Sequence, residues 1–294
     1  MPIGSQWFAA SGSSRESLKT TIDGLGKSAQ IIMDSADSDC YPGSGQNLLD
    51  LSGNDYDFFL GTSASAVAGE DPVFVGSAGD MSADTYFSFT GTADQLSGKT
   101  FKQNITAGSL PAWLQNVSKS TAGVFTACIM INYIQDPVQN HQPFIATNYP
   151  TVNAHIGFGF MIEGGSAYAP SIYIGKGGSA SDGFYNVVDN ALPTGPHMLA
   201  LSFNNGGTSF YYRDGAYDQV GSADTFTPTI ATQTANPLNQ LNICSGTTVA
   251  SSGATSGTAV TGTKFYSCFL DNTAWSKAEL DGVWEKVQPW LEDA

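Results

Sequence analysis

The chain has 294 residues, with 11 Lys and Arg against 26 Asp and Glu, a formal net charge of −15 and only 13% charged residues. Because this excess of negative charge repels phosphate groups, the composition disfavours nucleic acid and anionic membrane surfaces as partners. Aromatic residues make up 12% of the chain, too many for a disordered protein, and the 33 glycines indicate many turns. No apolar run approaches the roughly 18 residues of a membrane span, so we expect no membrane insertion.

The first 27 residues are mostly polar and contain one helix signal. Ser13 and Glu16 have the spacing of a capping box, which predicts a short helix that ends near Gly24. No secretory signal is visible, and we therefore expect synthesis in a cytoplasm without a signal peptide.

Two aromatic residues, Trp7 and Phe8, stand out in this polar segment. The segment has too few apolar residues to fold alone, and exposed aromatic residues near a chain end often dock onto another subunit. We expect residues 1–27 to be an attachment segment that binds through Trp7 and Phe8. A frayed tail is the alternative.

Between residues 28 and 272, short runs rich in aromatic and β-branched residues are separated by Gly, Asn, Asp and Pro. This pattern is typical of strands divided by turns. The ten predicted strands span residues 28–34, 85–91, 123–134, 143–148, 154–162, 170–175, 197–203, 209–215, 241–246 and 264–271. The sequence NNGG at 204–207 is a strong hairpin signal, and Asp214-Gly215 supplies a second turn. We interpret the low-complexity segment 249–262 as an exposed loop.

Residues 274–291 have the pattern of a second helix. Ser276 and Glu279 form another capping box, and Pro289 should end the helix. The apolar residues of this segment fall on one helix face: Leu280, Val283, Trp284 and Val287.

The four cysteines match no zinc-binding spacing. Cys128, Cys244 and Cys268 lie in apolar, strand-like runs, whereas Cys40 lies among turn residues. This placement favours buried, unreactive thiols over disulfides.

Four stretches carry a family resemblance through their order along the chain. The first is residues 33–60, which contain an Asp-Leu-Ser-Gly-Asn turn, and the second is residues 82–96. The third is the hairpin at 196–218, which contains Tyr-x-Asp-Gly, and the fourth is the closing strand and helix at 265–280. Together they resemble the concanavalin A-like, laminin-G-like jelly roll found in phage and phage-like particle structural proteins. The resemblance implies an all-β fold, a two-sheet antiparallel jelly-roll sandwich over 28–294 with short N-terminal and C-terminal helices.

Catalytic patterns are missing from the sequence. Glycan-cleaving relatives of this fold carry a Glu-x-Asp-x-x-Glu strand that supplies two carboxylates, and this chain has no such motif. There is also no Gly-x-Ser-x-Gly motif. We expect a non-enzyme in which His197, at the start of a strand, packs or forms hydrogen bonds.

Two groups of acidic residues could supply oxygen ligands to a hard cation such as calcium. They comprise Asp34, Asp37 and Asp39, and then Asp50, Asn54, Asp55 and Asp57. Capping of turns explains such clusters more simply. We therefore expect no cofactor, with calcium as the open alternative.

Candidate ligand-binding residues come from the hairpin and from tyrosines in loops or at edges. Alternation places Phe210 and Tyr212 on one face of the hairpin strand and Tyr211 and Arg213 on the other. The resemblance implies that Tyr212 packs, which leaves Tyr211 and Arg213 exposed. Since aromatic rings stack on sugars, the predicted ligand-binding residues are Tyr211, Arg213, Tyr217, Tyr185 and Tyr168.

These observations favour a virion-associated protein, a head spike, fibre or decoration subunit on a virion or phage-like particle, that binds host cell-surface polysaccharide without cleaving it. Its other partners would be virion structural proteins, reached through the N-terminal segment, and further copies of itself in a homo-oligomer. A purely structural capsid or tail decoration protein is one alternative, and a glycan-cleaving enzyme is the second.

Overall fold

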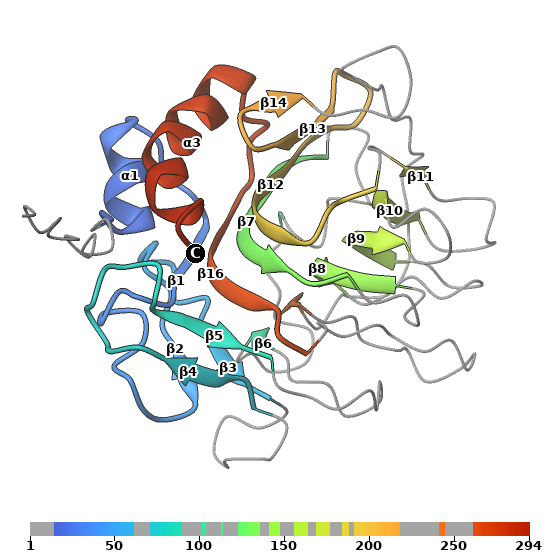
Figure 1. The fold of residues 1–294 in the computed structure, drawn as a ribbon. Helices are drawn as coiled ribbons and strands as arrows, with labels where there is room; N and C mark the ends of the chain where they lie inside the picture. The colour runs from blue at the N-terminus through green and yellow to red at the C-terminus, as the bar shows by residue number, and fades with distance from the viewer. Residues whose placement is uncertain are drawn as a thin grey trace, which may run out of the picture.

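The computed structural model describes residues 15–61, 71–89, 101–103, 113, 123–135, 141–147, 156–163, 169–176, 184–187, 191–217, 241–244 and 261–294. Within these residues the chain forms two antiparallel sheets of eight strands each and two helices (Figure 1). The predicted all-β, two-sheet sandwich with short terminal helices is therefore confirmed. Neither described helix has the length and apolar character needed to cross a membrane.

The first sheet has the strand order β14-β13-β12-β7-β16-β5-β4, and β1 pairs with β16 beside that path. Its strands are β1 (Ile31–Asp34), β4 (Val73–Val75), β5 (Tyr86–Ser88), β7 (Val124–Tyr133), β12 (Gly195–Asn204), β13 (Phe210–Arg213), β14 (Ala216–Tyr217) and β16 (Lys264–Asp271). The long strands β12, β7 and β16 form its centre.

The second sheet has the order β11-β10-β9-β8-β15-β6-β3-β2. Its strands are β2 (Asn47–Leu48), β3 (Phe58–Leu60), β6 (Phe101–Gln103), β8 (His141–Thr147), β9 (Ile156–Glu163), β10 (Ala169–Lys176), β11 (Phe184–Val187) and β15 (Leu241–Ile243). Each of the ten predicted runs overlaps one strand of the structure. Sequence reasoning missed six strands of two to four residues each: β2, β3, β4, β6, β11 and β14.

The first sheet is buried on both faces, because the second sheet covers one face and the helices cover the other (Figure 1). Strand β7 shows the pattern: Phe125 and Ile129 belong to the core between the sheets, and Cys128 and Met130 belong to the core under the helices. Alternation therefore sorts apolar residues between two cores instead of between core and solvent.

Helix α1 (Leu18–Gly24) ends where predicted but begins later. Its N-cap is Ser17, whose Oγ accepts a hydrogen bond from the Thr20 amide at 3.2 Å. The predicted cap, Ser13, lies outside the described residues. Glu16 precedes the helix and pairs with Lys286 at 3.1 Å, so the predicted capping box is wrong.

Helix α3 (Lys277–Leu291) has the predicted capping box between Ser276 and Glu279. The prediction that Pro289 ends the helix is wrong, since the helix runs through it to Leu291. Proline removes one backbone donor, but Trp290 and Leu291 are 3% and 0% exposed in the core under the helices. Their burial holds the last helical residues in place.

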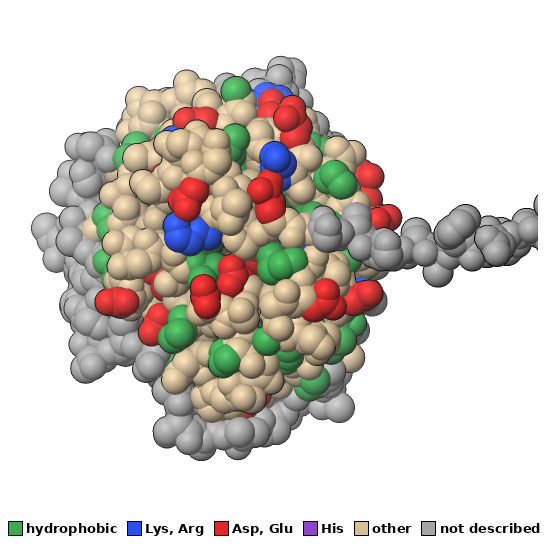
Figure 2. Space-filling view, turned by 90° about the vertical axis from the view of Figure 1, so that its left-hand side faces the viewer, with side chains coloured by type: hydrophobic (Ala, Val, Ile, Leu, Met, Phe, Trp, Pro, Cys, Tyr) green, Lys and Arg blue, Asp and Glu red, His purple; other side chains and the backbone are tan. Residues whose placement is uncertain are grey.

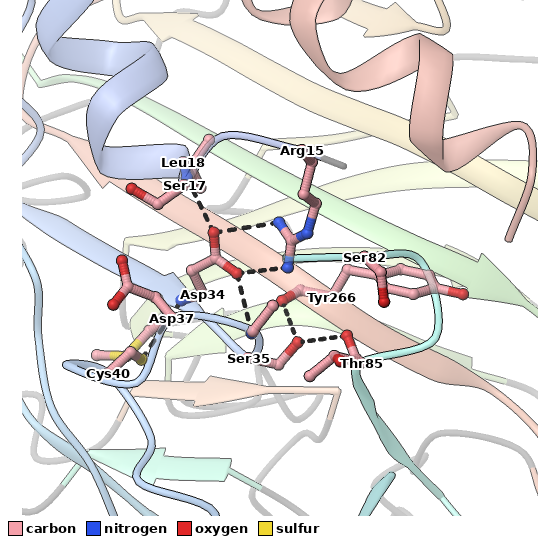
Figure 3. A network of polar contacts seen from close by, with 12 residues as sticks. Arg15, Ser17, Leu18, Asp34, Ser35, Asp37, Cys40, Ser82, Thr85 and Tyr266 are labelled. Carbon is pink, nitrogen blue, oxygen red and sulfur yellow. Dashed lines mark hydrogen bonds and ion pairs between the residues drawn. The ribbon is translucent and has the colours of Figure 1, made fainter. Parts of the chain in front are cut away.

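A buried ion pair joins the N-terminal segment to β1 (Figure 3). The Arg15 guanidinium donates to both carboxylate oxygens of Asp34, at 2.6 and 3.1 Å, and the two side chains are 1% and 0% exposed. The same carboxylate accepts from the amides of Leu18 and Ala36. Arg15 also lies over the Trp290 ring, 4.4 Å from its centroid, so one side chain connects the segment, β1 and α3.

All four cysteines are free and buried, as predicted. Burial raises the pKa of the Cys128 and Cys268 thiols well above the ordinary value. Both thiols are therefore neutral and poor nucleophiles in the folded protein.

We predict that Asp34→Asn lowers the free energy of unfolding by about 3–5 kcal/mol, because it leaves the Arg15 charge buried without a counter-ion. Urea denaturation measures the change. Asp23→Asn is the matched control, since Asp23 pairs with Lys19 on the surface with side chains 53% and 42% exposed. The control should cost less than about 1 kcal/mol, and an equal loss in both variants would contradict the prediction.

A second prediction concerns Glu279 and pH. Partial burial raises the pKa of this carboxyl, but hydrogen bonds from Lys27 and Ser276 outweigh burial and lower the pKa overall. A lowered folded-state pKa stabilises the protein at neutral pH, and this stabilisation is lost as the pH falls through that pKa. Glu279→Gln should therefore cost up to about 1 kcal/mol at pH 7, and the difference from wild type should vanish in acid. Denaturation curves across this pH range test the prediction, and a difference that persists when Glu279 is protonated would refute it.

Candidate functional site

The hairpin of β12 and β13 has the predicted form. Ser202 pairs with Phe210, so the turn contains the NNGG residues. Between β13 and β14, Asp214 and Gly215 have φ angles of 49° and 84°. Two successive positive φ values belong to a type I′ turn, the tight turn that suits a twisted hairpin.

His197 fastens this second turn to the start of β12. Its Nδ1 lies 2.6 Å from Asp214 Oδ2, and its Nε2 lies 2.9 Å from the Pro193 carbonyl oxygen. The other Asp214 oxygen accepts from the Met198 amide at 2.8 Å. Both ring nitrogens are therefore engaged, and the predicted hydrogen-bonding role of His197 is confirmed.

The turn meets helix α3 at a corner of the sandwich. The Tyr212 hydroxyl donates to Asp281 Oδ1 at 2.8 Å, and Lys277 Nζ donates to the same carboxylate at 2.6 and 2.7 Å. Lys277 Nζ also lies 3.3 Å from the Gly215 carbonyl oxygen. Burial, followed by the bond to Asp281, raises the pKa of the Tyr212 hydroxyl, which therefore stays a proton donor.

Trp284 completes this corner. A Cβ at Gly215 would lie 2.6 Å from Trp284 Nε1, so only glycine allows the turn to approach the indole. Trp284 is half-buried, and the side chains of Lys277 and Asp281 are 33% and 35% exposed. We call Tyr212, Asp214, Gly215, Lys277, Asp281 and Trp284 the hairpin corner. It combines a half-buried tryptophan with charged hydrogen-bonding groups at the surface.

The exposure predicted for Tyr211 is wrong. The alternation itself holds, because Phe210 and Tyr212 lie in the core under the helices and Tyr211 lies in the core between the sheets. Tyr211 is 2% exposed. Its ring packs edge-on against the Phe160 ring of the second sheet, with 5.9 Å between the two ring centroids. Two-sided burial of the sheet is the physical reason, since neither face of β13 reaches solvent. Arg213, at the end of the strand, is half-buried.

The other predicted ligand-binding residues are only partly placed. Tyr217 pairs with Tyr212 at the edge of the first sheet, and Tyr185 pairs with Tyr173 at the edge of the second. Since β13 faces β9 through the Tyr211–Phe160 contact, these two edges lie on the same side of the sandwich. Tyr168, Trp7 and Phe8 lie outside the described residues.

Sequence reasoning missed Lys277 and Asp281 and treated Trp284 only as a packing residue. One signal was available: Lys277 and Asp281 stand four residues apart near the start of an amphipathic helix, a spacing that places side chains side by side. Nothing in the sequence indicated that this pair would meet the turn at Asp214.

The acidic clusters suggested as calcium ligands form caps and turns. Asp50 accepts hydrogen bonds from the amides of Ile32, Ser52 and Tyr56, and Asp57 accepts one from Asp50. In the part of the chain that the structure describes, no group of three or more His, Cys, Asp or Glu residues is arranged to hold a metal ion.

Basic side chains do not gather on the helix-bearing side of the molecule (Figure 2). Lys19 pairs with Asp23, Lys27 with Glu279, and Lys286 with Glu16. Figure 2 accordingly shows blue side chains lying singly beside red ones. This side offers no basic patch to a strongly anionic polymer.

No protein-family model and no curated protein sequence matches this chain. Solved structures resemble its fold. The binding domain of botulinum neurotoxin DC in complex with SialylT matches with a TM-score of 0.54 and 9% identity, over 90% of this chain and 52% of that one. Domain 4 of AbnA, a GH43 extracellular arabinanase from Geobacillus stearothermophilus, in complex with arabinotriose, matches with a TM-score of 0.53 and 12% identity, over 86% and 97%.

A Trypanosoma rangeli sialidase matches with a TM-score of 0.50 and 12% identity, over 90% of this chain and 34% of that one. The match to the neurotoxin binding domain covers about half the length of that neurotoxin chain. At these identities the similarity concerns the fold, and the same sandwich occurs in binding domains and in part of an enzyme.

Proposed function

We propose that this protein binds a glycan, without cleaving it, and that the hairpin corner takes part in the contact. The observation that carries the proposal is the half-buried Trp284 beside the surface groups of Lys277 and Asp281. An aromatic face stacks on the apolar face of a sugar, and carboxylates and ammonium groups bond its hydroxyls. The structural neighbours solved with SialylT and with arabinotriose support this proposal through the fold.

The proposed ligand is a neutral or weakly charged polysaccharide. The net charge of −15 opposes a polyanion, and Lys277, the cation of the corner, already bonds Asp281. A sugar hydroxyl can both donate and accept, so it can add to this pair without displacing either charge.

A binding role fits the corner better than hydrolysis. A glycosidase needs one carboxyl group as acid and a second as nucleophile or base. Asp214 is engaged by His197 and the Met198 amide, and Asp281 by Tyr212 and Lys277. These contacts hold both carboxylates in fixed positions as hydrogen-bond acceptors.

The proposal extends to a location on a virion or phage-like particle, as a head spike, fibre or decoration subunit that binds host cell-surface polysaccharide. Its support is the order of the jelly-roll motifs in the sequence and the aromatic pair Trp7 and Phe8. In this arrangement the N-terminal segment contacts the particle. The described part of that segment, residues 15–27, packs against the sandwich through Leu18 and Ile22.

We predict that Trp284→Leu reduces glycan affinity at least tenfold, because leucine keeps apolar packing but has no ring to stack on a sugar. Binding is first located on a glycan array and on host envelope polysaccharide, and is then measured by calorimetry. Tyr86→Leu is the matched control: Tyr86 also packs, half-buried, against the core under the helices, but lies on β5 near the far edge of the sheet. Equal affinity of both variants, with both folded, would remove the hairpin corner from the proposal. Wild-type protein that binds no glycan would overturn the function itself.

We also predict that Trp7→Ala combined with Phe8→Ala releases the protein from particles while its glycan affinity stays unchanged. Sedimentation of particles assembled with each form measures the attachment. Retention of the double variant at the wild-type level would refute attachment through these two residues.

A further inference from the structure

A small cavity lies between the two sheets, at the end where β8 and β16 begin. Its lining includes Gln142 and Phe144 from β8, Tyr133 from β7, Cys244 and Thr263. The centre of a water molecule has about 10 Å³ of space there, which corresponds to one water and leaves no room for a larger ligand.

Two residues that line this cavity carry buried polar side-chain atoms: Gln142 of β8 and Thr263, which precedes β16. Gln142 is 3% exposed and Thr263 is 2% exposed. Both amide atoms of Gln142 and the Thr263 hydroxyl are buried and have no hydrogen-bond partner among the residues that the structure describes. A buried polar group without a partner is strongly unfavourable, so such groups indicate a bound polar molecule.

The pairing of β8 with β9 beside Pro143 places Gln142 on the inner face of the second sheet. Proline has no N–H for the ladder, and the pairing of β8 with β9 shifts between Pro143 and Ile145. Gln142 precedes this bulge and pairs with Ile162, a residue of the core between the sheets. Its amide is therefore placed between the sheets.

We propose that one ordered water molecule occupies this cavity and bridges Gln142 of the second sheet to Thr263, the residue that precedes β16 of the first sheet. Water both donates and accepts, which matches an amide and a hydroxyl together. A metal ion or anion is disfavoured because no charged side chain is among the described residues that line the cavity. Burial raises the pKa of the Cys244 thiol, so this thiol is neutral as well. The proposed site is independent of the hairpin corner.

The direct test is a crystal structure of the full chain at a resolution that shows ordered water. We expect one density peak within hydrogen-bond distance of both Gln142 and Thr263. An empty cavity, or a direct bond between the two side chains, would overturn the proposal.

A double-mutant cycle tests the same bridge in solution. Thr263→Val should raise the unfolding equilibrium constant about tenfold in the wild-type protein but less than about threefold in Gln142→Leu, because a shared water can be lost only once. The control pairs Gln142→Leu with Ser267→Ala. Ser267 lies on β16 and also has a buried hydroxyl without a partner among the described residues, but it does not line the cavity.

In the control pair, we expect Ser267→Ala to change the unfolding equilibrium constant by the same factor in the wild-type protein and in Gln142→Leu. Equal effects of Thr263→Val in both backgrounds would show that the two residues share no water. If a variant fails to fold, the crystal structure of the wild-type protein decides the question.

Discussion

The buried contact between Arg15 and Asp34 is the constraint on which the arrangement of the ends depends. Taking two charges out of water is costly, so such a pair persists only when geometry and further hydrogen bonds satisfy it. Here the carboxylate accepts from Arg15 and from two backbone amides, and the guanidinium also lies over Trp290. One pair thus fixes the start of α1, the first strand and the end of α3 against one another.

Burial of the first sheet on both faces decides where a ligand can meet this protein. A sheet covered by helices and by a second sheet keeps its side chains from solvent along the central strands. On the side of the first sheet that the helices cover, the turns and the polar side of α3 reach the surface. The hairpin corner forms where these two meet, and this explains why its members come from β13, a turn and a helix separated by some sixty residues.

The fold by itself leaves the function open, because the same sandwich occurs in a neurotoxin binding domain, an arabinanase domain and part of a sialidase. The side chains of the hairpin corner are therefore the features that favour binding. Their carboxylates are held by neighbouring donors, and the half-buried Trp284 lies beside them. Such a surface suits recognition of a polar, hydroxyl-rich molecule.

The sequence alone determined ten of the sixteen described strands, the β12–β13 hairpin, the capping box at Ser276 and the burial of the cysteines, because these follow from local periodicity and turn chemistry. Tertiary structure decided the rest. Tyr211 alternates as predicted, but it packs against the second sheet, and local sequence patterns do not predict that contact. Pro289 stays helical because Trp290 and Leu291 are buried. The meeting of Asp281 with Tyr212 depends on how α3 packs on the first sheet, a long-range contact that periodicity does not encode.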